Sequence, residues 1–171
     1  VGTTTKMLAD EAARELKKLG GKPAFLGYGG FPDVICISLN EEVVHGIPGA
    51  DIISDGDLVS LDFGVNYNGM ITDAAITVVA GESNGVKRKL LKGTEEALMA
   101  GISVVKDGVR TGDIGAAVEK VMAQYGFGIV RDLVGHGVGH EVHEEPDVPN
   151  YGVVGSGKKL SKGMTIAIEP M

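Results

Sequence analysis

Three acidic residues stand inside apolar segments that are typical of β-strands. They are Asp62 in VSLDFGV, Asp73 in MITDAAIT and Glu169 in TIAIEPM. Acidic residues are depleted in strands, and a buried carboxylate is costly to desolvate unless positive charge compensates it. Taken singly, each is more simply explained as a solvent-facing strand position. Three of them in one site would repel one another, so a shared multivalent cation is the simplest compensation.

Four histidines could complete such a cation site. His136, His140 and His143 lie together in VGHGVGHEVHEEP, and His45 precedes a turn in EEVVHGIPG. His136 cannot begin a zincin motif, because that motif needs Glu directly after its first histidine and Gly137 stands there. The interleaved glycines disfavour a helix, so we expect a strand or loop from which one or two rings face the site. His45 and His140, taken alone, are more simply explained as surface or hydrogen-bonded residues.

A helix pattern that could position these residues occurs twice. Residues 3–19 carry apolar positions at a 4-4-3 spacing, with Thr5 as the expected N-cap and Gly20-Gly21 as the stop. Residues 111–125 repeat this spacing, and each apolar position lies 106 residues after its counterpart (114 minus 8, for example). Two such helices in one register indicate an internal repeat.

A turn and a strand follow each predicted helix. The strands are Leu58–Val65 and Thr165–Glu169, and their offset of 107 residues (169 minus 62) sets Asp62 opposite Glu169. Each copy therefore carries an acidic residue within an apolar strand. This agreement extends the repeat from the helices to the residues that could carry chemistry.

The first copy continues beyond its acidic strand. Residues 66–69 give a hairpin signal that leads into a strand over Met70–Val79, which carries Asp73. A helix over roughly Asn84–Val105 then links the copies, which span approximately residues 1–83 and 107–171 of a single domain, 1–171. The counterparts of the second strand and of the linking helix are missing, so we expect the chain to be cut short at both ends. The predicted class is α+β, with a curved, mainly antiparallel sheet backed by helices.

The composition sets limits on the class of protein. The chain has 171 residues, a net charge of −7 and 43% hydrophobic residues, which is enough for one sizeable core. The acidic charge argues against nucleic acid or an anionic membrane as partner. The single cysteine, Cys36, fits a reducing compartment. Neither a signal peptide nor an apolar run of about 18 residues is present, so a soluble, cytoplasmic protein is expected.

Four segments of the chain together resemble the type I methionine aminopeptidases. They are GYGGFPDVICISLNEEVVHGIPG, VSLDFGVNYNGMITDAAIT, VGHGVGHEVHEEPDVPNYG and KGMTIAIEPM. They cover nearly the whole chain in the order found in that family. The resemblance implies the "pita-bread" fold, shared with prolidases and creatinases, with a pseudo-twofold repeat that is incomplete here. It also implies a metallo-exopeptidase that removes the N-terminal methionine from nascent proteins.

The resemblance further implies a site for two divalent metal ions held by five side chains. Asp62 would be the terminal ligand of one ion, Asp73 would bridge both, and His136 and Glu169 would complete the other. The fifth ligand, a second bridging glutamate, would follow beyond Met171. Oxygen-rich ligands with one imidazole suit manganese, iron(II), cobalt or zinc without choosing among them.

The resemblance also assigns the residues that would act on the substrate. His45 and His143 would contact the substrate and steady the tetrahedral intermediate, and Glu169 would shuttle a proton to the leaving amine. The resemblance assigns no role to His140. The pocket for the methionine side chain would be formed by Tyr28, Phe31 and Cys36.

The implied partners are the N-termini of peptides and nascent proteins, with association to the ribosome and a monomeric state as further expectations. Two alternatives stay open. One is a relative that acts on X-Pro bonds, such as an X-Pro aminopeptidase or a prolidase, although these usually carry an additional N-terminal domain. The other is a catalytically dead pita-bread module that binds peptides, because the fifth metal ligand is missing.

Overall fold

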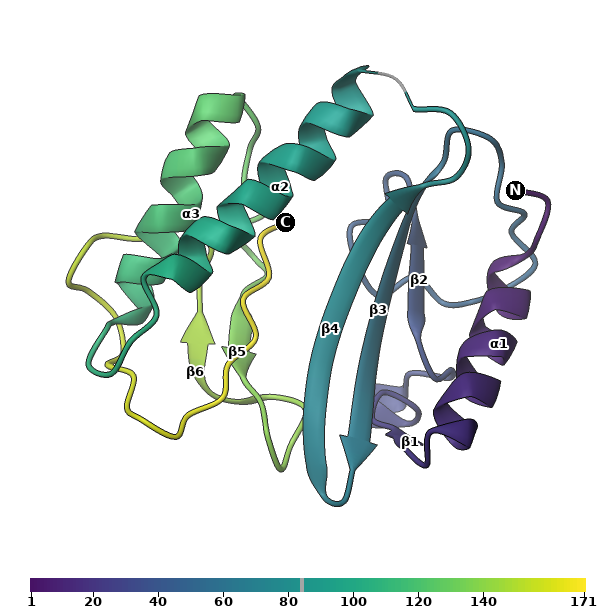
Figure 1. Cartoon of the computed structure of the whole chain (residues 1–171), viewed down its shortest axis with the longest axis horizontal. Helices are drawn as coiled ribbons and strands as arrows, with labels where there is room; N and C mark the ends of the chain where they lie inside the picture. Colours follow the sequence, from purple (N-terminus) through teal and green to yellow (C-terminus); the bar gives the residue numbers. More distant parts are fainter. Residues whose placement is uncertain (84) are drawn as a thin grey trace. The chain divides into compact units, whose positions relative to one another are not determined.

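The computed structural model describes residues 1–83 and 85–171, and these form two compact units. Unit 1 comprises Val1–Lys87 together with Gly139–Val142, and unit 2 comprises Arg88–Val138 together with His143–Met171. The chain therefore contributes two separate stretches to each unit. Figure 1 labels the helices and strands in the order of the sequence.

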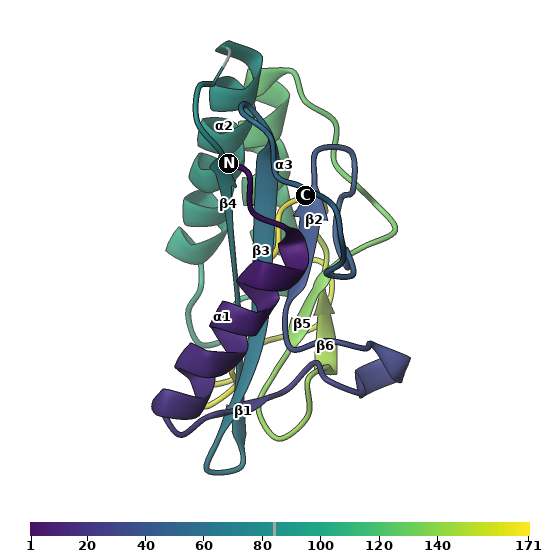
Figure 2. The ribbon, with the colours of Figure 1, turned by 90° about the vertical axis from the view of Figure 1, so that its right-hand side faces the viewer.

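Unit 1 contains one long helix and a four-stranded antiparallel sheet (Figures 1 and 2). The central strand β3 pairs along one edge with β4 and along the other with β2 and the short β1. A 3-10 turn, η1, lies between β1 and β2. The elements are α1 (Thr5–Lys18), β1 (Lys22–Pro23), η1 (Tyr28–Gly30), β2 (Cys36–Leu39), β3 (Leu58–Tyr67) and β4 (Met70–Val79).

The predicted helix and hairpin of this unit are confirmed, with one correction at the helix start. The N-cap is Thr4, whose hydroxyl oxygen accepts a hydrogen bond from the backbone N–H of Met7 at 3.1 Å. Thr5, the predicted cap, is instead buried inside the helix, where its hydroxyl oxygen accepts from the N–H of Gly49 at 2.8 Å. Two adjacent threonines offer equivalent caps, and the tertiary contact decides between them.

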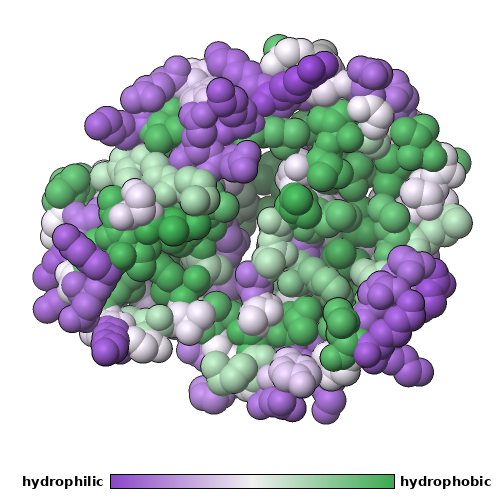
Figure 3. Space-filling model, viewed as in Figure 1, coloured by the Kyte–Doolittle hydropathy of each residue, from purple (hydrophilic) through white to green (hydrophobic). Residues whose placement is uncertain are grey.

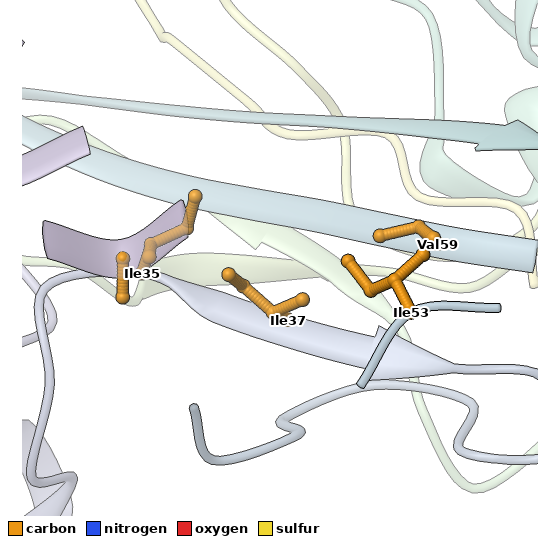
Figure 4. Packing of buried hydrophobic residues seen from close by; sticks show 5 residues of the cluster. Ile35, Ile37, Ile53 and Val59 are labelled. Carbon is orange, nitrogen blue, oxygen red and sulfur yellow. The ribbon is translucent and has the colours of Figure 1, made fainter. Parts of the chain in front are cut away.

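The core of unit 1 lies between α1 and one face of the sheet. Ala9 of α1 is fully buried in a cluster whose other buried members are aliphatic side chains from β2, β3 and the loops beside them (Figure 4). They are Ile35, Ile37, Ile53 and Val59. Because Ile37 is buried on this face, its neighbour Cys36 points to the opposite face of the sheet.

Unit 2 is built on a pair of helices. The elements are α2 (Gly85–Ser103), which begins in unit 1, α3 (Thr111–Tyr125), β5 (Gly135–Gly137) and β6 (Glu144–Val148). Ala97, Val118 and Met122 form the apolar seam between the helices. Gly101 allows close packing, since a Cβ there would lie 3.0 Å from the Val118 Cγ2 atom. The predicted start of the linking helix, Asn84, lies outside the described residues.

The predicted strand Thr165–Glu169 is not a strand in the structure. The segment makes one isolated bridge, between Gly137 and Ile166, and exchanges backbone hydrogen bonds with His136 through Ala167. Its partner β5 is only three residues long and has an irregular register with β6. A strand partner this short supports an extended segment but no continuous ladder.

Apolar side chains of β4 are exposed on the face of the sheet that also carries the unit 1 core, where Met70, Ile76 and Val78 are 47%, 61% and 41% exposed. Wide hydrophobic areas are visible in the view of Figure 3. Among the described residues, no helix has both the length and the apolar character needed to cross a bilayer.

Candidate metal centre

The two strand aspartates of unit 1 share one face of the sheet. In the register of β3 with β4, Asp62 is opposite Ala75 and Asp73 is opposite Gly64. The two carboxylates are thus diagonal neighbours on adjacent strands, and side chains in that relation point to the same side. Cys36 of β2 lies directly opposite Asp62 on the other edge of β3. Both aspartates are partly buried.

The pKa of the Cys36 thiol is affected by the burial and the negative charge of this face of the sheet. Burial, assisted by the negative charges of Asp62 and Asp73, raises the pKa of Cys36 to about 12. The thiol is therefore protonated at neutral pH. Because the thiolate is the form that binds metals, Cys36 is a neighbour of the carboxylates and not a metal ligand in this state.

Phe25 covers the same face beside Asp73, a feature that the sequence patterns did not reveal. A Cβ added to Gly64 would lie 2.3 Å from Cε1 of the Phe25 ring. Phe25 is 8% exposed, and its ring thus rests on the bare backbone of Gly64, directly across from Asp73. A glycine inside a strand pattern signals such a close approach, and Gly64 in LDFGV was that signal.

Unit 2 brings His136 and Glu169 together. His136 Nε2 lies 3.0 Å from Glu169 Oε1, and the imidazole is almost fully buried. The backbone holds the two residues in place, because His136 N–H donates to the Ala167 carbonyl at 3.2 Å and Ala167 N–H donates back at 2.7 Å. Gly135 permits this approach, since a Cβ there would lie 2.3 Å from the Ala167 carbonyl oxygen.

The pair fits a divalent cation better than a hydrogen bond. His136 Nδ1 lies 2.8 Å from the Gly137 carbonyl oxygen, which places the proton of the neutral ring on Nδ1 and leaves a lone pair on Nε2. Glu169 Oε1 is buried, and no donor among the described residues meets it with hydrogen-bond geometry. In the neutral ring, Nε2 would therefore present its lone pair to this carboxylate oxygen. Neighbouring ligands of one six-coordinate ion with bonds of about 2.1 Å stand about 3 Å apart, as these atoms do.

The remaining histidines differ in their surroundings. The His143 ring of unit 2 is exposed, and its centroid lies 4.0 Å from that of His136. His45 is exposed in unit 1 with a left-handed φ of 61°, which is uncommon for a residue other than glycine. His140 contacts the β3–β4 hairpin, where its Nδ1 lies 3.4 Å from the Gly69 carbonyl oxygen.

The three predicted pocket residues all lie in unit 1. Tyr28 begins η1, and Phe31 ends it with its N–H donating to the Tyr28 carbonyl at 2.9 Å, whereas Cys36 begins β2. Their role in a substrate pocket stays a prediction. The same holds for the full ligand set, because Asp62 and Asp73 belong to one unit and the His136–Glu169 pair to the other.

Comparison with known proteins gives a consistent result. Residues 1–171 match metallopeptidase family M24. Methionine aminopeptidase 1 of Bacillus subtilis is 45% identical over 170 residues, which are 99% of this chain and 68% of that protein. The crystal structure of methionine aminopeptidase from Thermotoga maritima is also 45% identical, with a TM-score of 0.96 over 99% of this chain and 68% of that one.

A more distant solved structure extends the likeness in fold. The prolidase from Pyrococcus furiosus is 28% identical, with a TM-score of 0.83 over 99% of this chain and 48% of that one. The predicted α+β pita-bread fold is thereby confirmed. A match over the full chain and relatives well above 30% identity leave one conclusion: the chain belongs to metallopeptidase family M24.

Proposed function

We propose that this protein is a metal-dependent aminopeptidase that removes the N-terminal methionine from peptides and nascent proteins. The observation that carries the proposal is the approach of His136 Nε2 to Glu169 Oε1 at 3.0 Å, where no donor among the described residues makes a hydrogen bond to the buried carboxylate oxygen. The name shared by the relatives at 45% identity supports methionine as the substrate residue. The prolidase, at 28% identity, gives weaker support to the X-Pro alternative.

The proposed ligands are Asp62, Asp73, His136 and Glu169, which together would hold two divalent ions. Manganese, iron(II), cobalt and zinc all accept such an oxygen-rich set with one imidazole. When bound, the ions supply Lewis acidity for the scissile carbonyl and lower the pKa of a coordinated water toward neutrality. The mutual repulsion of the three carboxylates is then compensated within the site.

The residues of the chain supply orientation and proton transfer. The hydrogen bond from His136 Nδ1 to Gly137 fixes the ring so that Nε2 faces the site. His143, exposed beside His136, is proposed to contact the substrate carbonyl, and His45 is proposed to act with it. Glu169 would carry a proton to the leaving amine in addition to its role as ligand.

The methionine side chain is proposed to enter a pocket formed by Tyr28, Phe31 and Cys36. A protonated, buried thiol suits an apolar thioether, because neither group carries charge. Phe25 would add an apolar wall on the carboxylate face. We further propose action on nascent chains in the cytoplasm, in association with the ribosome, by a monomer.

The ligand assignment is tested by His136→Ala with His140→Ala as the matched control. The control also removes an imidazole ring, but from His140, which lies four residues further along the chain and is not among the proposed metal ligands. Cobalt(II) and manganese(II) binding is measured by isothermal titration calorimetry, and hydrolysis is measured on Met-Ala-Ser and Ala-Pro-Ser peptides. We expect His136→Ala to lose metal binding and methionine release, and His140→Ala to keep both. Unchanged metal binding by His136→Ala refutes the assignment, and preferential cleavage of Ala-Pro-Ser refutes the proposed substrate.

A further inference from the structure

Asn150 contacts Glu169 and was assigned no role by the sequence analysis. It follows β6 by two residues and is 1% exposed. Its side-chain Nδ2 donates a hydrogen bond to the backbone carbonyl of Glu169 at 2.7 Å. Both residues belong to unit 2, as does His136.

This hydrogen bond completes a series along one edge of the segment that carries Glu169. The Thr165 carbonyl accepts from Val138 N–H at 3.1 Å, Ala167 exchanges two bonds with His136, and the Met171 carbonyl accepts from Val130 N–H at 2.9 Å. Every second residue is thus held by backbone donors except Glu169. At Glu169 the side chain of Asn150 supplies the bond that a neighbouring strand would otherwise give.

The other end of the Asn150 amide shows that general packing is not its main contribution. Its Oδ1 is buried, and no donor among the described residues reaches it. A buried carbonyl without a partner is unfavourable, and an apolar side chain of the same shape would avoid this. The amide therefore contributes through its N–H bond to the Glu169 backbone.

We propose that Asn150 is a positioning residue for the metal site: it holds the backbone at Glu169 so that the carboxylate stays against His136. The inference rests on the proposed function, since it requires Glu169 to be a metal ligand. Asn150 itself touches neither metal nor substrate in this proposal. Removing a residue that orients a metal ligand through a hydrogen bond commonly lowers metal affinity by about 10- to 100-fold.

The test uses the full chain with Asn150→Leu, which keeps the shape of the side chain and removes the amide. Asn150→Ser is a second variant, which stays polar but is too short to reach the carbonyl. Val118→Ala serves as the control for general destabilisation, because Val118 is fully buried in the helix seam of the same unit. Cobalt(II) affinity is measured by calorimetry, the visible spectrum of the bound cobalt is recorded, and apo-protein stability is measured by urea unfolding.

For both Asn150 variants we expect cobalt(II) affinity to fall by about 10- to 100-fold and the cobalt spectrum to change. For Val118→Ala we expect lower stability with nearly unchanged affinity and spectrum. If Asn150→Leu fails to fold, Asn150→Ser decides the question. Native affinity in a folded Asn150 variant, or an equal loss in Val118→Ala, overturns the proposal.

These outcomes are separable from failure of the proposed function. If His136→Ala loses cobalt while the Asn150 variants keep it, only the positioning role is wrong. If the unaltered chain binds no divalent metal, the ligand assignment falls, and the role of Asn150 falls with it.

Discussion

Replacing Gly135 by alanine should separate His136 from Glu169 and destabilise unit 2. The added Cβ would lie 2.3 Å from the Ala167 carbonyl oxygen and 3.3 Å from the Ile168 Cα atom. Both contacts are with backbone, so relief requires the whole segment to retreat by about 1 Å to reach ordinary van der Waals separation. The side chains of His136 and Glu169 would move apart with it.

The cost can be estimated from what that retreat disrupts. Two backbone hydrogen bonds between His136 and Ala167, at 2.7 and 3.2 Å, would be stretched or lost. At about 0.5–1.5 kcal/mol for each hydrogen bond, and with about 1–3 kcal/mol for overpacking, the free energy of unfolding should fall by about 2–6 kcal/mol. Cobalt(II) affinity should fall by about tenfold or more, because the ligands no longer keep their spacing.

Gly128→Ala is the matched control for this prediction. Gly128 lies in the same unit, a Cβ there would meet nothing within 4 Å, and neither glycine has a left-handed backbone. Urea unfolding followed by circular dichroism gives the stability of each variant, and calorimetry gives the cobalt(II) affinity. The control should stay within about 0.5 kcal/mol of the parent protein. If Gly135→Ala does the same and binds cobalt normally, the close approach does not set the geometry of the site.

Two further predictions concern the carboxylate face of unit 1. Since burial raises the pKa of Cys36 to about 12 and the thiol of an unfolded chain titrates at about 8.5, the unfolded state loses its proton first as pH rises. The buried thiol's contribution to the free energy of unfolding is complete below about pH 8.5 and should therefore decline between about pH 9 and 12. Urea unfolding across that range should show a weaker loss of stability in Cys36→Ala than in the parent protein. An equal loss of stability in both proteins would contradict the raised pKa of Cys36. Gly64→Ala should lower the free energy of unfolding by about 1–3 kcal/mol, and Phe25→Ala should lower it by about 3–5 kcal/mol. The double variant should lose clearly less than their sum, because removing the Phe25 ring relieves its clash, at 2.3 Å, with the new Cβ at position 64. Additivity within about 0.5 kcal/mol in that double-mutant cycle would show that the ring does not rest on Gly64.

The sequence predicted best those elements whose signals are local. Alternation over Leu58–Val65 and the hairpin signal at residues 66–69 predicted β3 and β4, and the short turn fixed the register that sets Asp62 and Asp73 on one face. The helix over residues 111–125 was also confirmed, ending at Gly126 in the left-handed conformation.

Features that depend on distant parts of the chain were predicted less well. The segment 165–169 alternates like a strand, but the strand that it contacts among the described residues, β5, is three residues long, so a ladder does not form. The bond from Asn150 to Glu169 spans 19 residues and follows no pattern of spacing. The ring of Phe25 on Gly64 is likewise a contact between elements, although the glycine itself marked the place.

The division of the chain bears on the order in which the protein can fold as it is synthesised. Residues 139–142 complete unit 1, where Ile71 N–H donates to the Gly139 carbonyl at 2.6 Å. An emerging chain that has reached α3 therefore still lacks part of its first unit, and the loop that closes it spans 68 residues (139 minus 71). Closure over such a separation slows folding more than it weakens the folded state. A cut after Lys87 would leave unit 1 without this closing segment.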